Sequence, residues 1–303
     1  MNLQPPFLQP GDTIGIVCPA GYMAAEKAAT CIQTLQEWGY RVKTGSTLGG
    51  DSASYFSGTD AERLQDLQHM MDDPAIKAIL CGRGGYGTGR IIDRLKFKKF
   101  RKHPKWIIGY SDITVLHAHL YHRYGIAGLH APMAAAFNDE GYKNPYVQSL
   151  RDALQGTKAR YTTDPHADNR CGEAEGVLVG GNLALLAHLV GSVSDGKTKG
   201  KILFIEDVGE QLYNIDRMMH QLKRAGKLDK LSGLVFGGFT ELKDTERPFG
   251  QTVQDILRAL VAEYEYPVCF DFPVSHTDRN YALKVGVRYR LSVTGEAVKL
   301  EEC

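Results

Sequence analysis

Two patterns of hydrophobic residues alternate along the first half of the chain. Short runs rich in β-branched residues occupy 12–19, 75–81 and 106–108, and such runs are typical of buried strands. Between them, apolar residues recur every three or four positions, for example over 28–38 and 59–71, which favours amphipathic helices. We expect a further helix between residue 90 and the run at 106–108. This alternation predicts a parallel sheet with helices on both faces.

The second half repeats the alternation and then changes. Strands are expected at 176–181, 201–206, 233–239 and 268–273, and helices around 182–189, 212–222 and 253–260. Alternating residues over 283–293, a turn at 294–296 and an apolar run at 298–300 predict a closing hairpin.

A polar stretch separates the two halves, with little apolar periodicity over about 148–169. We therefore predict an α/β protein with a Rossmann-like parallel-sheet domain at 1–150, a connection at 151–170, and a second α/β domain at 171–303 that ends in the hairpin.

The balance of charged residues limits the classes of binding partner that are expected. Of 303 residues, 36 are Lys or Arg and 35 are Asp or Glu, which gives a net charge of +1. A chain without a broad field of one sign is not expected to bind nucleic acid or an anionic membrane, although a local anion site is still possible.

The six cysteines indicate a reducing compartment. They are scattered singly, mostly in apolar stretches and without a C-x-x-C pair, which predicts buried, reduced thiols rather than disulfides or a zinc site. Residues 1–6 lack the basic and apolar regions of a signal peptide, and no apolar run approaches the roughly 20 residues of a membrane-spanning helix. We expect a cytoplasmic protein.

Ser111 is the first candidate catalytic residue. The run at 106–108 is followed by Gly109, and Ser111 stands directly before a helical pattern with Ile113 and Leu116 on one face. A serine on such a turn is held at the edge of a sheet, where backbone N–H groups can stabilise an oxyanion. Serine is also a common helix N-cap, so this stretch alone supports a nucleophile and a cap equally.

Gly82, Gly84 and Gly87 form a G-x-G-x-x-G pattern after the strand at 75–81. This matches the dinucleotide fingerprint, so a nucleotide-binding module is one hypothesis. The fingerprint normally opens the first βαβ unit and has an acidic residue about twenty positions later, and both features are missing here.

The same glycines fit a second hypothesis, in which bare backbone approaches a reacting carbonyl. The N–H groups of Gly85 and Asp112 would then form an oxyanion hole, and Arg83 would bind a substrate carboxylate in bidentate fashion. A solvated arginine paired with a surface acid is the alternative for Arg83.

A nucleophilic serine needs an imidazole base. His276 follows a strand on an irregular loop, where a functional histidine is expected. The other candidates fit structural positions better, as partly exposed helix residues or as core residues. These are His117, His119 and His122 for the helix, and His130 and His188 for the core. No metal site is predicted from them.

The base needs an acid to orient it, and Glu206 stands at the end of a buried strand, where a carboxylate is costly to place. Asp207 and Glu210 are close enough in sequence to serve instead, and the alternative is that one of these acids caps the next helix. Sequence spacing leaves these alternatives open.

Six blocks together resemble the LD-carboxypeptidases, also called murein tetrapeptide carboxypeptidases. They are Arg83-Gly84-Gly85-Tyr86-Gly87, Gly109-Tyr110-Ser111-Asp112, Gly180-Gly181-Asn182-Leu183, Ile205-Glu206-Asp207-Val208, Tyr213-Asn214-Ile215-Asp216-Arg217 and Ser275-His276.

The resemblance covers nearly the whole chain. It implies a cytoplasmic, homodimeric serine peptidase without metal or organic cofactor, which removes the terminal D-alanine from peptidoglycan tetrapeptides in cell-wall recycling. By position, Ser111 would be the nucleophile, His276 the general base and Glu206 the orienting acid. Apart from the resemblance, Arg83 and Gly84 are the predicted substrate-binding residues.

A sister group resembles the microcin C immunity proteins, which hydrolyse acyl or peptidyl sulfamoyl adenylates. Those proteins tend to carry extra loop sequence with an aromatic residue that stacks on the base. Here compact elements account for most of the segment between Glu206 and His276, so the recycling carboxypeptidase is preferred.

Overall fold

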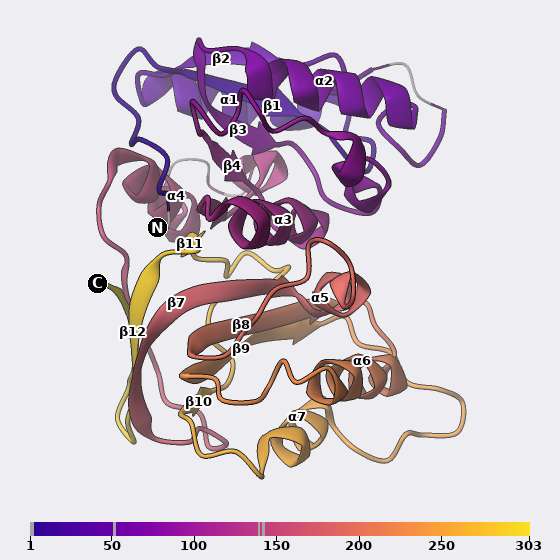
Figure 1. The fold of residues 1–303 in the computed structure, drawn as a ribbon, viewed down its shortest axis with the longest axis vertical. Helices are drawn as coiled ribbons and strands as arrows, with labels where there is room; N and C mark the ends of the chain where they lie inside the picture. Colours follow the sequence, from indigo (N-terminus) through magenta and orange to yellow (C-terminus); the bar gives the residue numbers. More distant parts are fainter. Residues whose placement is uncertain (1–2, 51–52, 139, 141–142) are drawn as a thin grey trace. The chain divides into compact units, whose positions relative to one another are not determined.

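The computed structural model describes residues 3–50, 53–138, 140 and 143–303 (Figure 1). The chain forms two compact units. The first comprises Met1–Thr157 with Tyr281–Lys284, and the second comprises Lys158–Asn280 with Val285–Cys303.

A six-stranded sheet forms the centre of the first unit, in the order β11-β5-β4-β3-β1-β2. Its strands are β1 (Thr13–Val17), β2 (Arg41–Thr44), β3 (Ile76–Cys81), β4 (Trp106–Ile108), β5 (Gly128–His130) and β11 (Leu283–Val285). The pairs from β2 through β5 are parallel. The predicted parallel sheet is confirmed, and functional loops in such sheets gather at the carboxyl ends of the strands.

The helices of the first unit are α1 (Ala29–Glu37), α2 (Asp60–Asp72), α3 (Thr114–Tyr124) and α4 (Pro145–Gln155). The helix expected before β4 is replaced by two 3₁₀ turns, Thr88–Arg90 and Ile92–Arg94. Gly87 precedes them with φ of 142°, and the apolar side chains that follow, Leu95 and Phe97, are buried two residues apart rather than at helical spacing. That part of the prediction is wrong.

The second unit contains a seven-stranded mixed sheet in the order β10-β9-β8-β7-β12-β13-β6. Its strands are β6 (Arg160–Thr163), β7 (Gly172–Asn182), β8 (Lys201–Val208), β9 (Gly233–Thr240), β10 (Val268–Cys269), β12 (Arg288–Val293) and β13 (Val298–Glu302). Strands β7 to β10 pair in parallel, and β12 and β13 form the predicted antiparallel hairpin.

Two segments differ from expectation in this half. The stretch 151–170 contains the end of α4 and the edge strand β6, which pairs with β13. Residues 283–293 are divided between β11, in the first sheet, and β12, in the second. An edge strand with one solvated face carries polar residues, so the sequence of β6 lacks the apolar run of a central strand.

Three helices cover the second sheet: α5 (Leu183–Leu189), α6 (Leu212–Arg224) and α7 (Val253–Val261). Ile215, Met219 and Leu222 form the buried face of α6 at the expected helical spacing. No helix in the described ranges is long and apolar enough to cross a membrane.

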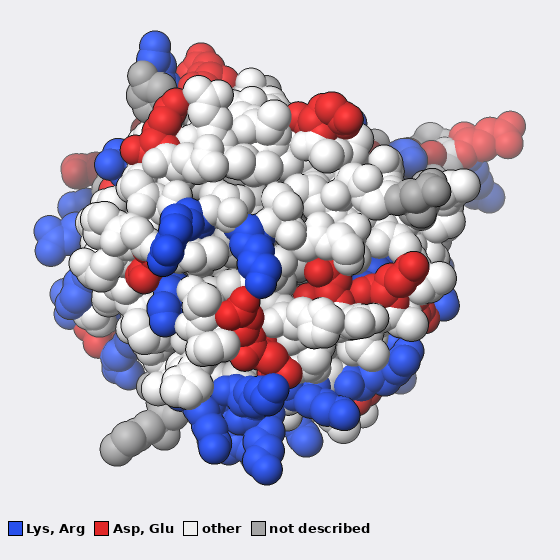
Figure 2. All heavy atoms as spheres, turned by 90° about the horizontal axis from the view of Figure 1, so that it is seen from above, with Lys and Arg blue, Asp and Glu red and all other residues white. Residues whose placement is uncertain are grey.

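The charged surface is mixed, as the near-zero net charge predicts. Figure 2 shows acidic and basic side chains interspersed on the face that it draws, with a group of lysines and arginines near one edge. Cys18, Cys31, Cys81 and Cys269 are buried, Cys171 and Cys303 are exposed, and all six are free thiols.

A buried arginine on α2 ties together the loops at one edge of the first sheet. Arg63 is 0% exposed, and its Nη1 donates to the carbonyl oxygens of Pro19 (2.6 Å) and Gly87 (3.0 Å). Its Nε donates to the carbonyl of Gly58, and its Nη2 pairs with Asp60. One side chain therefore links the loops after β1, before α2 and after β3.

We expect Arg63→Met to destabilise the first unit by about 3 kcal/mol, because buried carbonyl groups and Asp60 lose a charged donor. Urea unfolding followed by tryptophan fluorescence measures this, since the two tryptophans, Trp38 and Trp106, both lie in the first unit. The exposed Arg94→Met is the matched control. An equal, small effect of both substitutions would contradict the assignment.

Candidate active site

Ser111 stands on a strained turn between β4 and α3. Its φ is +62°, in the left-handed region that residues with a side chain rarely adopt. The 3₁₀ turn Ser111–Ile113 is preceded by Tyr110, and neither this turn nor α3 has a side-chain N-cap hydrogen bond. The hypothesis that Ser111 is a helix cap is therefore wrong. Such strain costs of order 1–3 kcal/mol and is concentrated at functional sites.

Bare glycine backbone lies against this serine. A Cβ atom built on Gly84 would be 2.7 Å from Cβ and 3.0 Å from Oγ of Ser111, and 3.4 Å from the backbone nitrogen of Asp112. Any larger residue at position 84 would press on the hydroxyl. The buried carboxylate of Asp112 accepts a hydrogen bond from the backbone N–H of Thr88 (2.7 Å), which fixes the far end of the glycine loop.

Two other predicted site residues of the glycine loop adjoin Gly84. Gly85 has φ of +101°, and a Cβ there would be 2.8 Å from Oη of Tyr55. The exposed Arg83 donates from Nη1 to the carbonyl of Tyr22 (2.9 Å). A guanidinium has five N–H donors, so this bond orients Arg83 and leaves donors for a carboxylate.

The loop lacks the main feature of a dinucleotide site. That fingerprint places a pyrophosphate at the N-terminus of a helix. Here the glycines lead into a 3₁₀ turn of three residues, Thr88–Arg90. The nucleotide-binding hypothesis therefore loses its physical basis at this loop.

An acid–imidazole pair forms in the second unit. Glu206 on β8 is 0% exposed, and its Oε2 lies 2.6 Å from Nδ1 of His276. A carboxylate only accepts hydrogen bonds, so Nδ1 carries the proton in this pair, and in a neutral ring Nε2 is then the basic nitrogen.

Opposing effects set the pKa of His276. Burial lowers the pKa, whereas the hydrogen bond to Glu206 and the negative charges of Glu206, Asp207 and Glu241 raise it, and the net pKa lies above its ordinary value. The carboxylate thus increases the basicity of the ring.

The other two candidate acids have different roles. Asp207 is buried, and it accepts hydrogen bonds from Nδ2 of Asn182 (2.8 Å) and from the backbone N–H of Ala184 (3.0 Å) at the start of α5. Burial raises the pKa of Asp207 to about 6. Glu210 accepts from Nδ2 of Asn214 (3.1 Å). None of the three acids caps the next helix, α6, whose N-cap is Gln211 without a side-chain hydrogen bond, so that expectation is wrong. Asp207 instead supports the start of the preceding helix, α5, beside its N-cap Asn182, and Glu206 is bonded to the imidazole.

A β-bulge opposite Glu206 supports the pair. Ile205 pairs with Phe236 and Asp207 pairs with Phe239, so two glycines of β9, Gly237 and Gly238, face the single residue Glu206.

The segment that leads to His276 packs directly on this bulge. A Cβ on Gly237 would lie 2.1 Å from the carbonyl oxygen of Val274, and one on Gly238 would lie 2.6 Å from Cβ of Ser275. Gly238 also donates its N–H to the Val274 carbonyl (3.0 Å). The bulge was not predicted from the sequence, although a Gly-Gly pair inside a strand pattern is a signal of a bulge.

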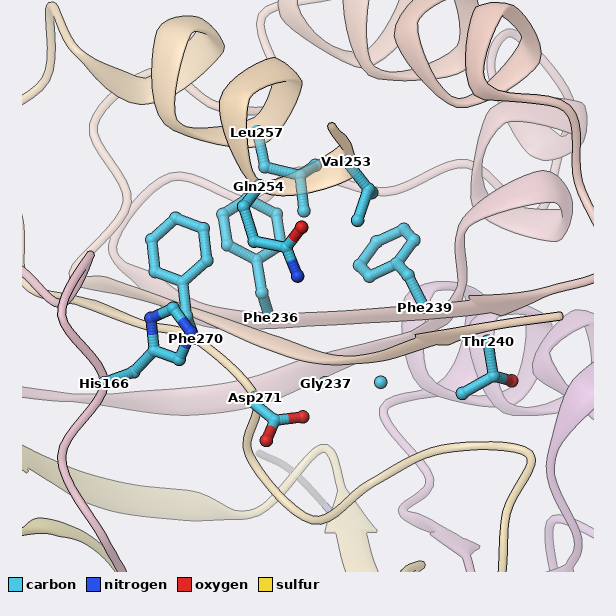
Figure 3. Close-up of a pocket in the computed structure, with 11 residues that line it drawn as sticks. His166, Phe236, Gly237, Phe239, Thr240, Val253, Gln254, Leu257, Phe270 and Asp271 are labelled. Atoms are coloured by element: carbon cyan, nitrogen blue, oxygen red, sulfur yellow. The ribbon is translucent and has the colours of Figure 1, made fainter. Parts of the chain in front are cut away.

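A cavity of about 110 Å³ lies beside the bulge. Figure 3 shows the rings of Phe236, Phe239 and Phe270 facing residues of α7, with His166 and Asp271 nearby. Its lining contains neither Glu206 nor His276, so we place no chemistry there.

The remaining histidines are mainly structural. His117 and His119 are buried rather than partly exposed, His130 is buried as predicted, and His188 is exposed, contrary to prediction. Nε2 of His117 donates to the carbonyl of Gly109 (2.8 Å), and burial lowers the pKa of His117 to about 4. Within the described ranges no group of residues is arranged to hold a metal ion.

Comparison with known proteins defines the class. Residues 14–131 match the LD-carboxypeptidase N-terminal domain, and residues 175–291 match the LD-carboxypeptidase C-terminal domain. The chain belongs to the LD-carboxypeptidase family, and it is a serine-type carboxypeptidase.

Three individual proteins illustrate the similarity. The chain is 35% identical to a probable murein peptide carboxypeptidase from Bacillus subtilis, over 99% of this chain and 95% of the relative. It is 27% identical to the microcin C7 self-immunity protein MccF from Escherichia coli, over 96% and 94%. The crystal structure of muramoyltetrapeptide carboxypeptidase from Oxalobacter formigenes superposes with a TM-score of 0.86, at 28% identity and over 96% and 98% of the chains.

We expect Glu206→Gln to lower the pKa of His276. The amide keeps the ring buried, which lowers the pKa, but removes the negative charge that raises it. The imidazole then loses its proton at a lower pH than in the unaltered protein. An NMR titration of the His276 ring measures the shift, with Glu210→Gln as the matched control. An unchanged or higher pKa in Glu206→Gln would refute the coupling.

Proposed function

We propose that this protein removes the terminal D-alanine from peptidoglycan tetrapeptides by way of an acyl-enzyme on Ser111. The left-handed turn of Ser111, against the bare backbone of Gly84, is the observation that carries the proposal. It exposes a hydroxyl to substrate where a helix cap would hide one. The family and the murein peptide relative supply the substrate class.

In the first half of the reaction, Oγ of Ser111 attacks the carbonyl that precedes the terminal residue. His276 accepts the serine proton at Nε2, and Glu206 holds the ring in the required tautomer. The N–H groups of Gly85 and Asp112 stabilise the oxyanion.

In the second half, His276 donates the proton to the amine of the departing D-alanine. Water then attacks the acyl-enzyme, with His276 again as base, and Ser111 is released. Arg83 binds the carboxylate that marks the end of the peptide, and Gly84 leaves room for it.

The location and the assembly belong to the same proposal. The resemblance to the family supports a cytoplasmic enzyme that acts as a homodimer on muropeptides released during cell-wall recycling.

A second candidate activity is supported by the relative MccF. In this alternative the same serine, base and acid hydrolyse an acyl or peptidyl sulfamoyl adenylate. The chemistry at the carbonyl is unchanged, and the leaving group is a nucleotide analogue in place of an amino acid.

We expect the protein to release one alanine from a tetrapeptide ending in D-alanine, detected by mass spectrometry, with EDTA having no effect. Ser111→Ala should lower kcat by about 10⁴ to 10⁶, whereas the exposed Ser46→Ala, in the same unit, should retain it. Full activity of Ser111→Ala, or loss of activity with EDTA, would contradict the mechanism.

The same assay separates the alternatives. Cleavage of a sulfamoyl adenylate without cleavage of the tetrapeptide would favour the second candidate. Submicromolar calorimetric binding of NAD or ATP by a protein that cleaves neither substrate would favour a nucleotide-binding module.

A further inference from the structure

Two exposed aromatic side chains lie at the glycine loop: Tyr86 belongs to the loop, and Tyr55 lies against it. Tyr55 is 56% exposed and Tyr86 is 50% exposed, and they are two of the five exposed large hydrophobic residues in the described chain. Burial in the core does not account for rings left this open to solvent. Their position at the glycine loop indicates a role in binding substrate.

The two rings are held by a third. Phe56 lies between them, with its centroid 5.4 Å from that of Tyr55 and 5.8 Å from that of Tyr86. The guanidinium groups of Arg63 and Arg90 lie 4.8 and 5.3 Å from the Phe56 centroid. The aromatic group is thus anchored to the buried arginine of α2.

Backbone hydrogen bonds fix the same segment. The carbonyl of Tyr55 accepts from the N–H of Tyr22 (3.0 Å), and Phe56 forms an antiparallel bridge with Gly21. Gly21 in turn donates to the carbonyl of Gly84 (3.0 Å). Rings fixed before a ligand arrives lose little conformational freedom on binding.

This aromatic group adjoins Ser111. Oη of Tyr55 would lie 2.8 Å from a Cβ on Gly85, and a Cβ on the preceding residue, Gly84, would lie 2.7 Å from Cβ of Ser111. The hydroxyl end of Tyr55 therefore lies beside the two glycines that pack against Ser111.

We propose that Tyr55 and Tyr86 form a substrate subsite, here called the tyrosine platform, that binds a ring carried by the substrate outside the cleaved bond. Exposed aromatic faces bind the flat or CH-rich faces of other rings by dispersion and stacking. Two substrates supply such a ring: a sugar on a glycan-linked peptide, or the base of an adenylate. The inference rests on the proposed function and adds the part of the substrate that is recognised.

Steady-state kinetics of four variants test the platform. Tyr55→Leu and Tyr86→Leu remove the ring and keep apolar bulk, whereas Tyr55→Phe and Tyr86→Phe keep the ring and remove the hydroxyl. The substrates are a free tetrapeptide, an N-acetylmuramoyl tetrapeptide and an aminoacyl sulfamoyl adenosine. Phe7→Leu, at another exposed aromatic residue of the first unit (37% exposed), is the control.

We expect each leucine variant to raise KM about tenfold for a ring-bearing substrate, with kcat unchanged. The phenylalanine variants should behave as the unaltered protein, and the free tetrapeptide should show no change. The ring-bearing substrate that is affected identifies the source of the ring. Equal losses on the free and ring-bearing peptides, or no loss on either ring-bearing substrate, would overturn the platform.

A binding measurement separates this inference from the proposed reaction. If the protein cleaves no tetrapeptide, the proposed function fails, and calorimetry with Ser111→Ala still tests the platform. The two ring-bearing compounds are titrated into Ser111→Ala with and without the leucine substitutions. Affinities that do not change with Tyr55→Leu or Tyr86→Leu would refute the subsite.

Discussion

The fully buried carboxylate of Glu206 needs a hydrogen-bond partner, and the structure around the His276 imidazole supplies one. An ionised group such as Glu206 is costly to remove from water unless a partner satisfies it, and His276 is that partner. The pair forms because β9 bulges at two glycines and lets the segment before His276 pack at backbone distance. The bulge and the segment thus bring the imidazole to the buried carboxylate, and the carboxylate raises the pKa of His276.

In the first unit the corresponding constraint is the exclusion of side chains. Ser111 holds a left-handed conformation, and the space beside it belongs to Gly84. Hydrogen bonds around the turn hold this arrangement, from His117 to the Gly109 carbonyl and from Thr88 to Asp112. Backbone strain persists when neighbouring contacts of this kind fix it.

Much of this was predictable from local pattern. A β-branched run followed by a glycine and a serine defines the turn at Ser111, and an irregular loop after a strand points to His276. Glu206 was one of three acids by spacing, and the family resemblance selected it. The bond to His276 agrees with that choice.

The features that were missed depend on long-range packing. Arg63 lies on the buried face of α2, where carbonyl groups of the segment just before the helix and of two loops distant in sequence accept its hydrogen bonds. His188 lies in an apolar stretch, but the helix turns it outward. The glycine loop leads into two 3₁₀ turns, although Ile91, Ile92 and Leu95 are buried at a spacing that also fits a helix. Periodicity within one segment carries no information about such partners.

The proposed function requires that Ser111 and His276 act as one catalytic group. The most direct test is the kcat for D-alanine release of Ser111→Ala, His276→Ala and the double variant. Residues that act as a unit are non-additive, so the double variant should be no slower than the slower single variant. If the two losses multiply, each residue acts independently and the account is wrong.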